Sequence, residues 1–220
     1  MRRERPDVVN VVSSTSWTPD EDFDVLLDAV IQYDALAKKS QTTRRTSLRA
    51  KKTNDNDNDK NKNKDKKLPI LNILITGRGA LRESFEKRAK DAKLRHVRFS
   101  YAWLPIEEYP EHLAMSDLGV CLHQSSSQLD LPMKIVDMFG VGIPVLARTY
   151  PCLVEELVQE KVNGLTFSSS DKLCNCLVTL LNGWDGGTPK LEMLENNVTR
   201  DRVDALFSSP SIASLLHSWM

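Results

Sequence analysis

The stretch LPILNILITGRG, residues 68–79, sets a pattern that the rest of the chain repeats. An apolar, largely aliphatic run ends in the turn Gly77-Arg78-Gly79, and apolar residues then recur at helical spacing from Ala80 to Leu94. A run that is apolar at nearly every position predicts a strand buried on both faces. The stretch is therefore interpreted as a strand, a tight turn and the start of a helix.

The same alternation of strands and helices continues in both directions. It predicts right-handed β-α-β units, and so an α/β fold: a Rossmann-like parallel sheet with helices on both faces. The expected strands are Asp7–Ser13, Leu68–Thr76, Val97–Phe99 and Asp117–Leu122, followed by a turn and a fifth strand within Val141–Ala147 and a turn and a short sixth strand within Asn163–Phe167. The expected helices are Pro19–Ala37, Ala80–Leu94, Ile106–Met115, Met133–Phe139, Leu153–Val158, Leu173–Leu181, Leu191–Asn197 and Val203–Trp219, the last broken at Pro210. Thr18 is expected to cap the first helix, with Pro19 at its first position.

The formal net charge of zero combines two parts of opposite sign. The segment Lys38–Lys67 holds 12 Lys/Arg and 4 Asp, a charge of +8, whereas the other 190 residues hold 18 basic and 26 acidic groups, a charge of −8. Because the positive charge lies in one polar segment, the charge argues against a folded face that grips nucleic acid. We expect this segment to be a disordered insertion, with attraction to RNA or to an anionic lipid surface as the alternative.

The expected organisation is one domain, residues 1–37 and 68–200, interrupted by a disordered basic insertion at 38–67 and followed by a C-terminal helical tail at 201–220. The chain has no run of about 18 apolar residues, so the sequence predicts no transmembrane segment. The four cysteines, Cys121, Cys152, Cys174 and Cys176, are too scattered for a disulfide scaffold and are interpreted as reduced thiols. No nearby ligands complete a site with Cys174 and Cys176, so no metal is expected.

In such sheets ligands bind at the carboxyl ends of the strands, near the point where the strand order reverses. The loop at 13–18 offers the hydroxyls of Ser14 and Ser16 just before a helix. Gly77 and Gly79 would let the backbone approach a ligand, and Arg78 would direct a guanidinium at it. Both loops suit phosphate, although glycine often serves turn geometry alone.

The loop at 123–133 leads into a helix whose first turn contains Met133 and Lys134. The helix dipole disfavours a cation there, so Lys134 indicates either an anionic ligand or a snorkelled side chain. Asp137 follows three residues later. The two residues form either a helical Lys–Asp pair or a site in which the carboxylate takes two sugar hydroxyls and the lysine lies near phosphate. The pattern leaves both interpretations open.

Longer segments of the sequence narrow the range of possible functions. Residues 140–145 resemble the helix–Gly–x–Pro–Val–strand segment of nucleotide-sugar glycosyltransferases with two facing Rossmann-like domains, the GT-B architecture. Residues 13–23, 75–79, 103–110, 116–123 and 129–140 are similar, in order, to the chitobiosyldiphosphodolichol β-mannosyltransferase family. The resemblance covers about Val8 to Phe167, apart from the insertion, and matches the C-terminal, donor-binding half of that family.

The resemblance implies a GDP-mannose-dependent β-1,4-mannosyltransferase of protein N-glycosylation. Such an enzyme transfers mannose, with inversion, to dolichol-linked chitobiose diphosphate at the cytosolic face of the endoplasmic reticulum membrane. It implies a nucleotide sugar and the dolichol-linked acceptor as partners, and no cofactor or nucleic acid. The alternative is a non-catalytic donor-binding module or a subunit that needs a separate membrane-anchored partner. A more remote alternative is an adaptor whose basic insertion docks to acidic membranes or RNA.

The resemblance also suggests site residues. Related enzymes carry two glutamates, the second of which holds the ribose; Asp137 matches this second position, whereas the first falls on Leu129, one residue before Asp130. Inverting transfer needs a general base and positive charge for the departing diphosphate. The base usually comes from the half that is not matched; within this chain the candidates are Asp130 and His123, each with a structural role as the alternative. The expected donor-binding residues are Ser14, Ser16, Gly77, Arg78, Gly79, Met133, Lys134 and Asp137.

Overall fold

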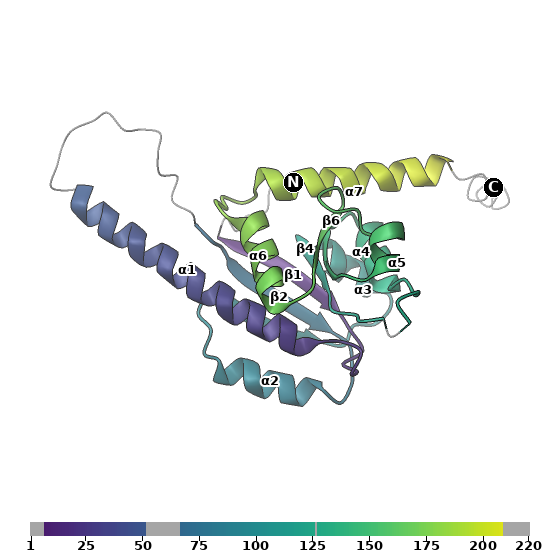
Figure 1. The fold of residues 1–220 in the computed structure, drawn as a ribbon, viewed down its shortest axis with the longest axis horizontal. Helices are drawn as coiled ribbons and strands as arrows, with labels where there is room; N and C mark the ends of the chain where they lie inside the picture. Colours follow the sequence, from purple (N-terminus) through teal and green to yellow (C-terminus); the bar gives the residue numbers. More distant parts are fainter. Residues whose placement is uncertain (1–6, 52–66, 126, 209–220) are drawn as a thin grey trace.

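The computed structural model describes residues 7–51, 67–125 and 127–208 of the 220-residue chain. Its centre is a six-stranded parallel sheet in the order β3-β2-β1-β4-β5-β6 (Figure 1). The strands are β1 Val8–Ser14, β2 Ile70–Thr76, β3 Val97–Ala102, β4 Leu118–Cys121, β5 Val145–Arg148 and β6 Gly164–Phe167. The strand order reverses between β1 and β4, where α/β sheets bind their ligands. The predicted fold class is confirmed.

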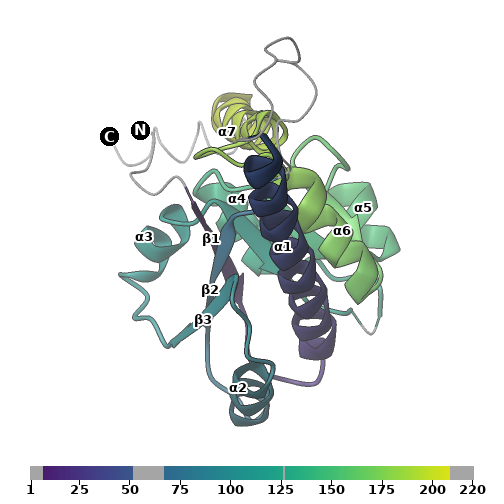
Figure 2. The ribbon, with the colours of Figure 1, turned by 90° about the vertical axis from the view of Figure 1, so that its left-hand side faces the viewer.

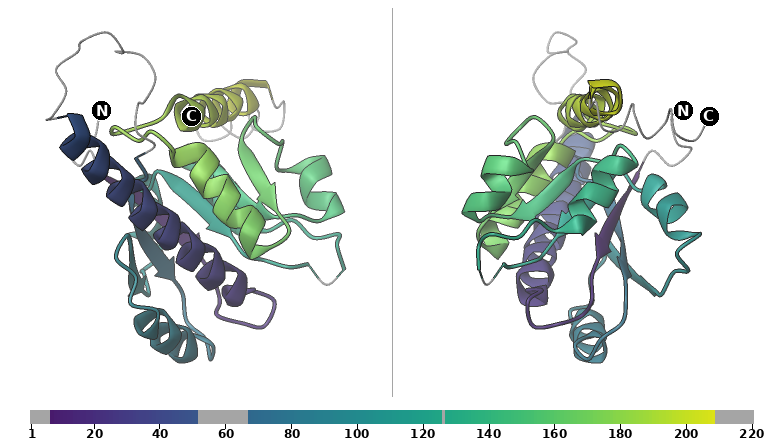
Figure 3. Two further views of the ribbon diagram at one scale, coloured as in Figure 1. Left: turned by 60° about the vertical axis from the view of Figure 1, so that its left-hand side comes forward. Right: turned by 90° about the vertical axis from the view of Figure 1, so that its right-hand side faces the viewer.

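Helices cover both faces of the sheet (Figures 2 and 3). On one face α1 (Phe23–Lys51) lies beside α6 (Ser170–Leu181), and α2 (Arg82–Asp91) adds Phe85 to the same apolar core. On the other face α3 (Tyr109–Ala114), α4 (Met133–Gly140) and α5 (Pro151–Glu156) share a second core with Val12 and Val145. The last helix, α7 (Pro189–Ser208), packs against α4 and α6. The central strands β4 and β5 are thus buried on both faces, which explains their apolar sequences, whereas the edge strand β3 alternates and exposes Arg98 and Ser100.

The first helix differs from the prediction at both ends. It begins at Phe23 rather than Pro19, and Asp22 rather than Thr18 accepts the first-turn amide of Val25 at 3.2 Å. It also continues past Ala37 to Lys51, so the first part of the expected disordered insertion is helical. No glycine or proline stands between residues 38 and 51 to stop it. Residues 52–66 lie outside the described part of the chain.

The end of the chain also differs. The two helices expected near residues 191–197 and 203–219 form a single helix, α7, from Pro189 to Ser208, because residues 198–202 contain no helix breaker. The expected helical tail beyond Ser208 lies outside the described residues. Within residues 7–51, 67–125 and 127–208, none of the helices has both the length and the apolar character needed to cross a bilayer.

Candidate functional site at the carboxyl edge of the sheet

The loops that follow β1 and β2 pack directly on each other. Gly77 has φ +109°, and a Cβ built on it would lie 1.7 Å from the carbonyl oxygen of Thr15. A Cβ on Gly79 would lie 2.3 Å from the carbonyl oxygen of Ser16. The sequence suggested that these glycines let a ligand approach the backbone. The structure shows that the close contact with the loop after β1 already leaves no room for a side chain at either position.

The loop after β1 is less open than its polar composition suggested. Ser14 and Thr15 are buried, and Trp17 is fully buried with its ring stacked on Phe23 at a centroid distance of 4.2 Å. Among residues 13–17, Ser16 is the exposed one. Ser16 and the neighbouring turn therefore form the accessible part of this loop.

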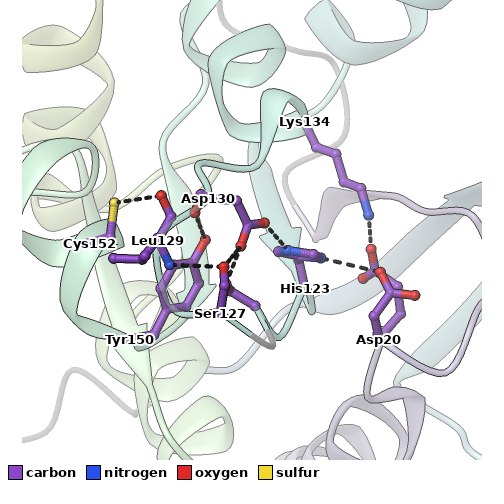
Figure 4. A network of polar contacts seen from close by, with 10 residues as sticks. Asp20, His123, Ser127, Leu129, Asp130, Lys134, Tyr150 and Cys152 are labelled. Atoms are coloured by element: carbon purple, nitrogen blue, oxygen red, sulfur yellow. Dashed lines mark hydrogen bonds and ion pairs between the residues drawn. The ribbon is translucent and has the colours of Figure 1, made fainter.

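Three successive carboxylates after β1 each face a basic side chain from another element. The pairs are Asp20 with His123, Glu21 with Lys134, and Asp22 with Arg148. The backbone completes this junction, because the amide of Gln124 donates to the carbonyl of Asp20 at 2.8 Å and Glu21 forms an antiparallel bridge with His123. The segments on either side of the switch point are thus joined by charge and by hydrogen bonds (Figure 4).

The Glu21–Lys134 pair is the most deeply buried of these three ion pairs. The Glu21 side chain has no exposed surface and that of Lys134 is 22% exposed. Burial lowers the pKa of Lys134 to about 8, although the negative charge of Asp20 acts to raise it. Lys134 forms no ion pair with Asp137 among the described residues, so the helical Lys–Asp pair considered from the sequence is not present. The lysine at the start of α4 is instead balanced by a carboxylate from another loop.

Asp130 anchors the loop between β4 and α4 (Figure 4). One carboxylate oxygen accepts from the hydroxyls of Ser125 and Ser127, and the other lies 2.7 Å from Nε2 of His123. The hydrogen bonds from Ser125 and then His123 lower the pKa of Asp130 to about 2. The Tyr150 hydroxyl donates to the carbonyl of Asp130 at 2.9 Å. The structure therefore brings the two candidate bases into contact with each other.

A second polar chain crosses the switch point from β1 to α4. The hydroxyls of Ser14 and Tyr109 are 2.8 Å apart, and Tyr109 donates to Oδ2 of Asp137 at 3.4 Å. Two expected donor-binding residues are thus linked through a tyrosine that the sequence analysis did not single out. Tyr109 belonged to a segment that resembles the family, but no local pattern indicated where its hydroxyl would point.

Arg78 lies at the ends of β2 and β3. Its guanidinium carbon is 4.4 Å from the centre of the Trp103 ring, a cation–π contact, and Trp103 is 57% exposed. An exposed cation and an exposed indole therefore lie side by side at this edge, and the role of Arg78 in anion binding stays a prediction.

Within the part of the chain that the structure describes, one group of three side chains offers atoms that could ligate a metal ion. Ligand atoms of Asp20, Glu21 and His123 all lie within 4.8 Å of one another. The ammonium of Lys134 already pairs with Glu21 and places positive charge where a cation would bind. The group would hold a metal ion only if this lysine moved away or lost its proton.

The parallel sheet, its switch point and the polar loops at its carboxyl edge define a Rossmann-like α/β domain of the kind found in GT-B glycosyltransferases. The model of the glycosyl transferases group 1 family matches residues 61–183, more than half of the chain. The chain belongs to this family.

Relatives extend the comparison to nearly the whole chain. It is 44% identical over 195 residues to the UDP-glycosyltransferase TURAN of Arabidopsis thaliana, covering 89% of this chain and 39% of that protein. It is 38% identical over 213 residues to the chitobiosyldiphosphodolichol beta-mannosyltransferase of Mus musculus, and this match covers 96% of this chain and 39% of the mouse protein. The Homo sapiens protein of the same name is 40% identical over 196 residues, covering 89% and 36%. The chain therefore spans less than two fifths of the length of these relatives.

Solved structures support the fold. Anabaena HepE in complex with UDP-glucose superposes with a TM-score of 0.61 at 19% identity, covering 96% of this chain and 49% of that one. The catalytic domain of cholesterol-alpha-glucosyltransferase from Helicobacter pylori gives 0.56 at 12% identity, covering 89% and 99%. At these identities the likeness establishes the fold and nothing about the ligand.

Proposed function

We propose that this chain is the donor-binding half of a β-mannosyltransferase that takes mannose from GDP-mannose and gives it to dolichol-linked chitobiose diphosphate. The observation that carries the proposal is the polar carboxyl edge at the switch point, in a chain 38–40% identical to mammalian enzymes of that name. The reaction would add the first mannose of the lipid-linked oligosaccharide, at the cytosolic face of the endoplasmic reticulum.

The diphosphate would lie between Arg78 and the start of α4. The first amides of a helix have no partner within it, so those of Met133 and Lys134 suit an anion, assisted by the dipole of α4. Arg78 is held by Trp103 within reach of the same edge. Positive charge directed at the departing diphosphate lowers the barrier to transfer, because negative charge develops there as the glycosidic bond breaks.

The ribose would be held by Asp137. Its carboxylate is exposed on α4 and one of its oxygens is tied to Tyr109, which leaves the other oxygen for a hydroxyl of the ligand. The serine hydroxyl of Ser16 and the turn at Gly77 and Gly79 would border the same ligand.

His123 and Asp130 are better suited to shaping the loop than to serving as the general base. Both ring nitrogens of His123 already face carboxylates of the protein, Asp20 at 3.4 Å and Asp130 at 2.7 Å. Asp130 in turn accepts from two serines, and its low pKa makes it a weak proton acceptor at neutral pH. We therefore expect the base for the acceptor hydroxyl to come from outside this pair.

The alternative is a donor-binding module that is completed by a separate, membrane-anchored partner. Calorimetry with GDP, GDP-mannose and UDP tests donor binding, and a transfer assay with a chitobiose diphospholipid tests whether the chain acts alone. We expect heat with the two guanine nucleotides and little or no transfer without a partner. Binding of UDP but not GDP would refute the proposed donor; absence of heat with all three would refute a donor-binding role.

Asp137→Ala is the most direct test of the site. We expect it to weaken GDP binding while the melting temperature stays unchanged, because the side chain is exposed. Asp91→Ala, which removes an exposed carboxylate from the end of α2, is the matched control and should bind as the parent protein does. Equal GDP affinity in all three proteins would reject the assigned role of Asp137.

A further inference from the structure

The hydroxyl of Tyr109 contacts a side chain of β1 and a side chain of α4. Its ring packs with the apolar core beneath α3 and α4, and Pro110 follows it at the start of α3. The packing fixes the ring, and the fixed ring determines where the hydroxyl lies. The hydroxyl stands 2.8 Å from the Ser14 hydroxyl and 3.4 Å from Oδ2 of Asp137.

The direction of this hydrogen-bond chain follows from its chemistry. An ionised carboxylate only accepts, so Tyr109 must donate to Asp137. The single proton of the tyrosine is then used, and the Ser14 hydroxyl must donate to the oxygen of Tyr109. Burial is the largest influence on the pKa of Tyr109 and raises it, so the hydroxyl keeps its proton at neutral pH. The chain therefore runs from Ser14 through Tyr109 to Asp137.

The carboxylate at the end of this chain needs such a constraint. Asp137 is exposed on the second turn of α4, where a short acidic side chain otherwise samples several rotamers. Lys134, one turn earlier, does not orient it, because that lysine pairs with Glu21. The Tyr109 hydroxyl engages one carboxylate oxygen and leaves Oδ1 free of the described hydrogen bonds.

We infer that Tyr109 is a positioning residue for the sugar-hydroxyl contact of the donor nucleotide: by engaging Oδ2 of Asp137, it presents Oδ1 to the ribose diol. This inference rests on the proposed function, since it assumes that Asp137 meets the ribose. Tyr109 itself touches no ligand. Ser14 then acts indirectly as well, by completing the hydrogen bonding of the tyrosine from the end of β1.

The test compares GDP with dideoxy-GDP, which lacks both ribose hydroxyls, in Tyr109→Phe. The substitution keeps the ring and removes only the hydroxyl. We expect GDP to bind about tenfold more weakly, equivalent to about 1.4 kcal/mol, whereas the affinity for dideoxy-GDP stays the same. A purely structural role would weaken both nucleotides equally, so the ratio of the two affinities separates positioning from folding.

Tyr101→Phe is the matched control. Tyr101 is a half-buried tyrosine on β3 that packs with the core on the opposite face of the sheet, so its loss of a hydroxyl should leave the affinity ratio unchanged. Suppose that the parent protein binds GDP and prefers it to dideoxy-GDP. An unchanged ratio of the two affinities in Tyr109→Phe would then overturn the inference and leave the proposed function standing. Parent protein that binds neither nucleotide would overturn both.

Discussion

Replacing Lys134 with methionine should destabilise the domain strongly, although the lysine lies at the edge of the proposed ligand site. Methionine has a similar length and no charge, so the substitution leaves the Glu21 carboxylate buried without its partner. Breaking a buried ion pair on one side costs about 3–5 kcal/mol. Because Lys134 retains some contact with solvent, we expect a loss near the lower end, about 3 kcal/mol.

Urea unfolding at neutral pH measures this loss. The effect should depend on pH, because the folded variant relieves the penalty by protonating Glu21 whereas the unfolded chain keeps this group ionised. Its folded state then binds the extra proton, so the stability of the variant should rise as the pH falls, by up to about 1.4 kcal/mol per pH unit. The parent protein should show no such rise.

Two further variants control the experiment. The double variant Glu21→Gln with Lys134→Met removes both charges, and we expect it to recover most of the lost stability. Lys87→Met, on the exposed side of α2, should change stability by no more than about 0.5 kcal/mol. A loss below about 1 kcal/mol in Lys134→Met, or no recovery in the double variant, would show that Glu21 does not depend on this lysine.

Three other predictions follow from the packing. Gly77→Ala should prevent accumulation of folded protein, because the added Cβ would overlap the carbonyl oxygen of Thr15; a melting temperature like that of the parent would refute this. Burial opposes ionisation of Asp34, but hydrogen bonds from Lys38 and from the amides of His96 and Arg95 outweigh it and hold the pKa below its usual value. Asp34→Ala should therefore cost at least about 2 kcal/mol at neutral pH, and this difference should become smaller in urea unfolding experiments as the pH falls through the lowered pKa, because the protonated carboxyl loses its charge-assisted hydrogen bonds. Burial raises the pKa of Cys121 to about 12, so its thiol should resist alkylation near pH 8 in the folded protein and react after unfolding in urea, as mass spectrometry can measure.

Local sequence patterns predicted the strands well because a parallel strand covered by helices on both faces is apolar at most of its positions. The run at 70–75 lies in β2, with β1 on one side and β3 on the other, and the alternation of elements was enough to predict a parallel sheet. The same patterns predicted that the loops after the strands would gather at one edge, and the structure does bring residues of the loops after β1, β2 and β4 together there.

The boundaries of α1 were less predictable. Thr18 and Pro19 form a typical helix start, yet the chain first pairs Glu21 with His123 across the switch point and starts its helix at Phe23. The partner in that bridge, His123, follows just over a hundred residues further along the chain, so a local pattern does not contain it. At the other end, the polar, basic composition of residues 38–67 suggested disorder, but residues 38–51 lack a helix breaker and α1 continues through them.

The sequence by itself determined the sheet, its parallel direction, the edge at which a ligand would bind and the residues, such as Arg78, Lys134 and Asp137, that could meet a phosphate or a sugar. These follow from apolar periodicity and from residue chemistry, both of which are local. Only the tertiary structure decided which partners those residues have: Glu21 for Lys134, Tyr109 for Asp137, and Thr15 for Gly77. Such partners lie far apart in sequence or on different loops, and ion pairs and hydrogen bonds act over only a few ångströms, so folding must bring them together before they can be identified.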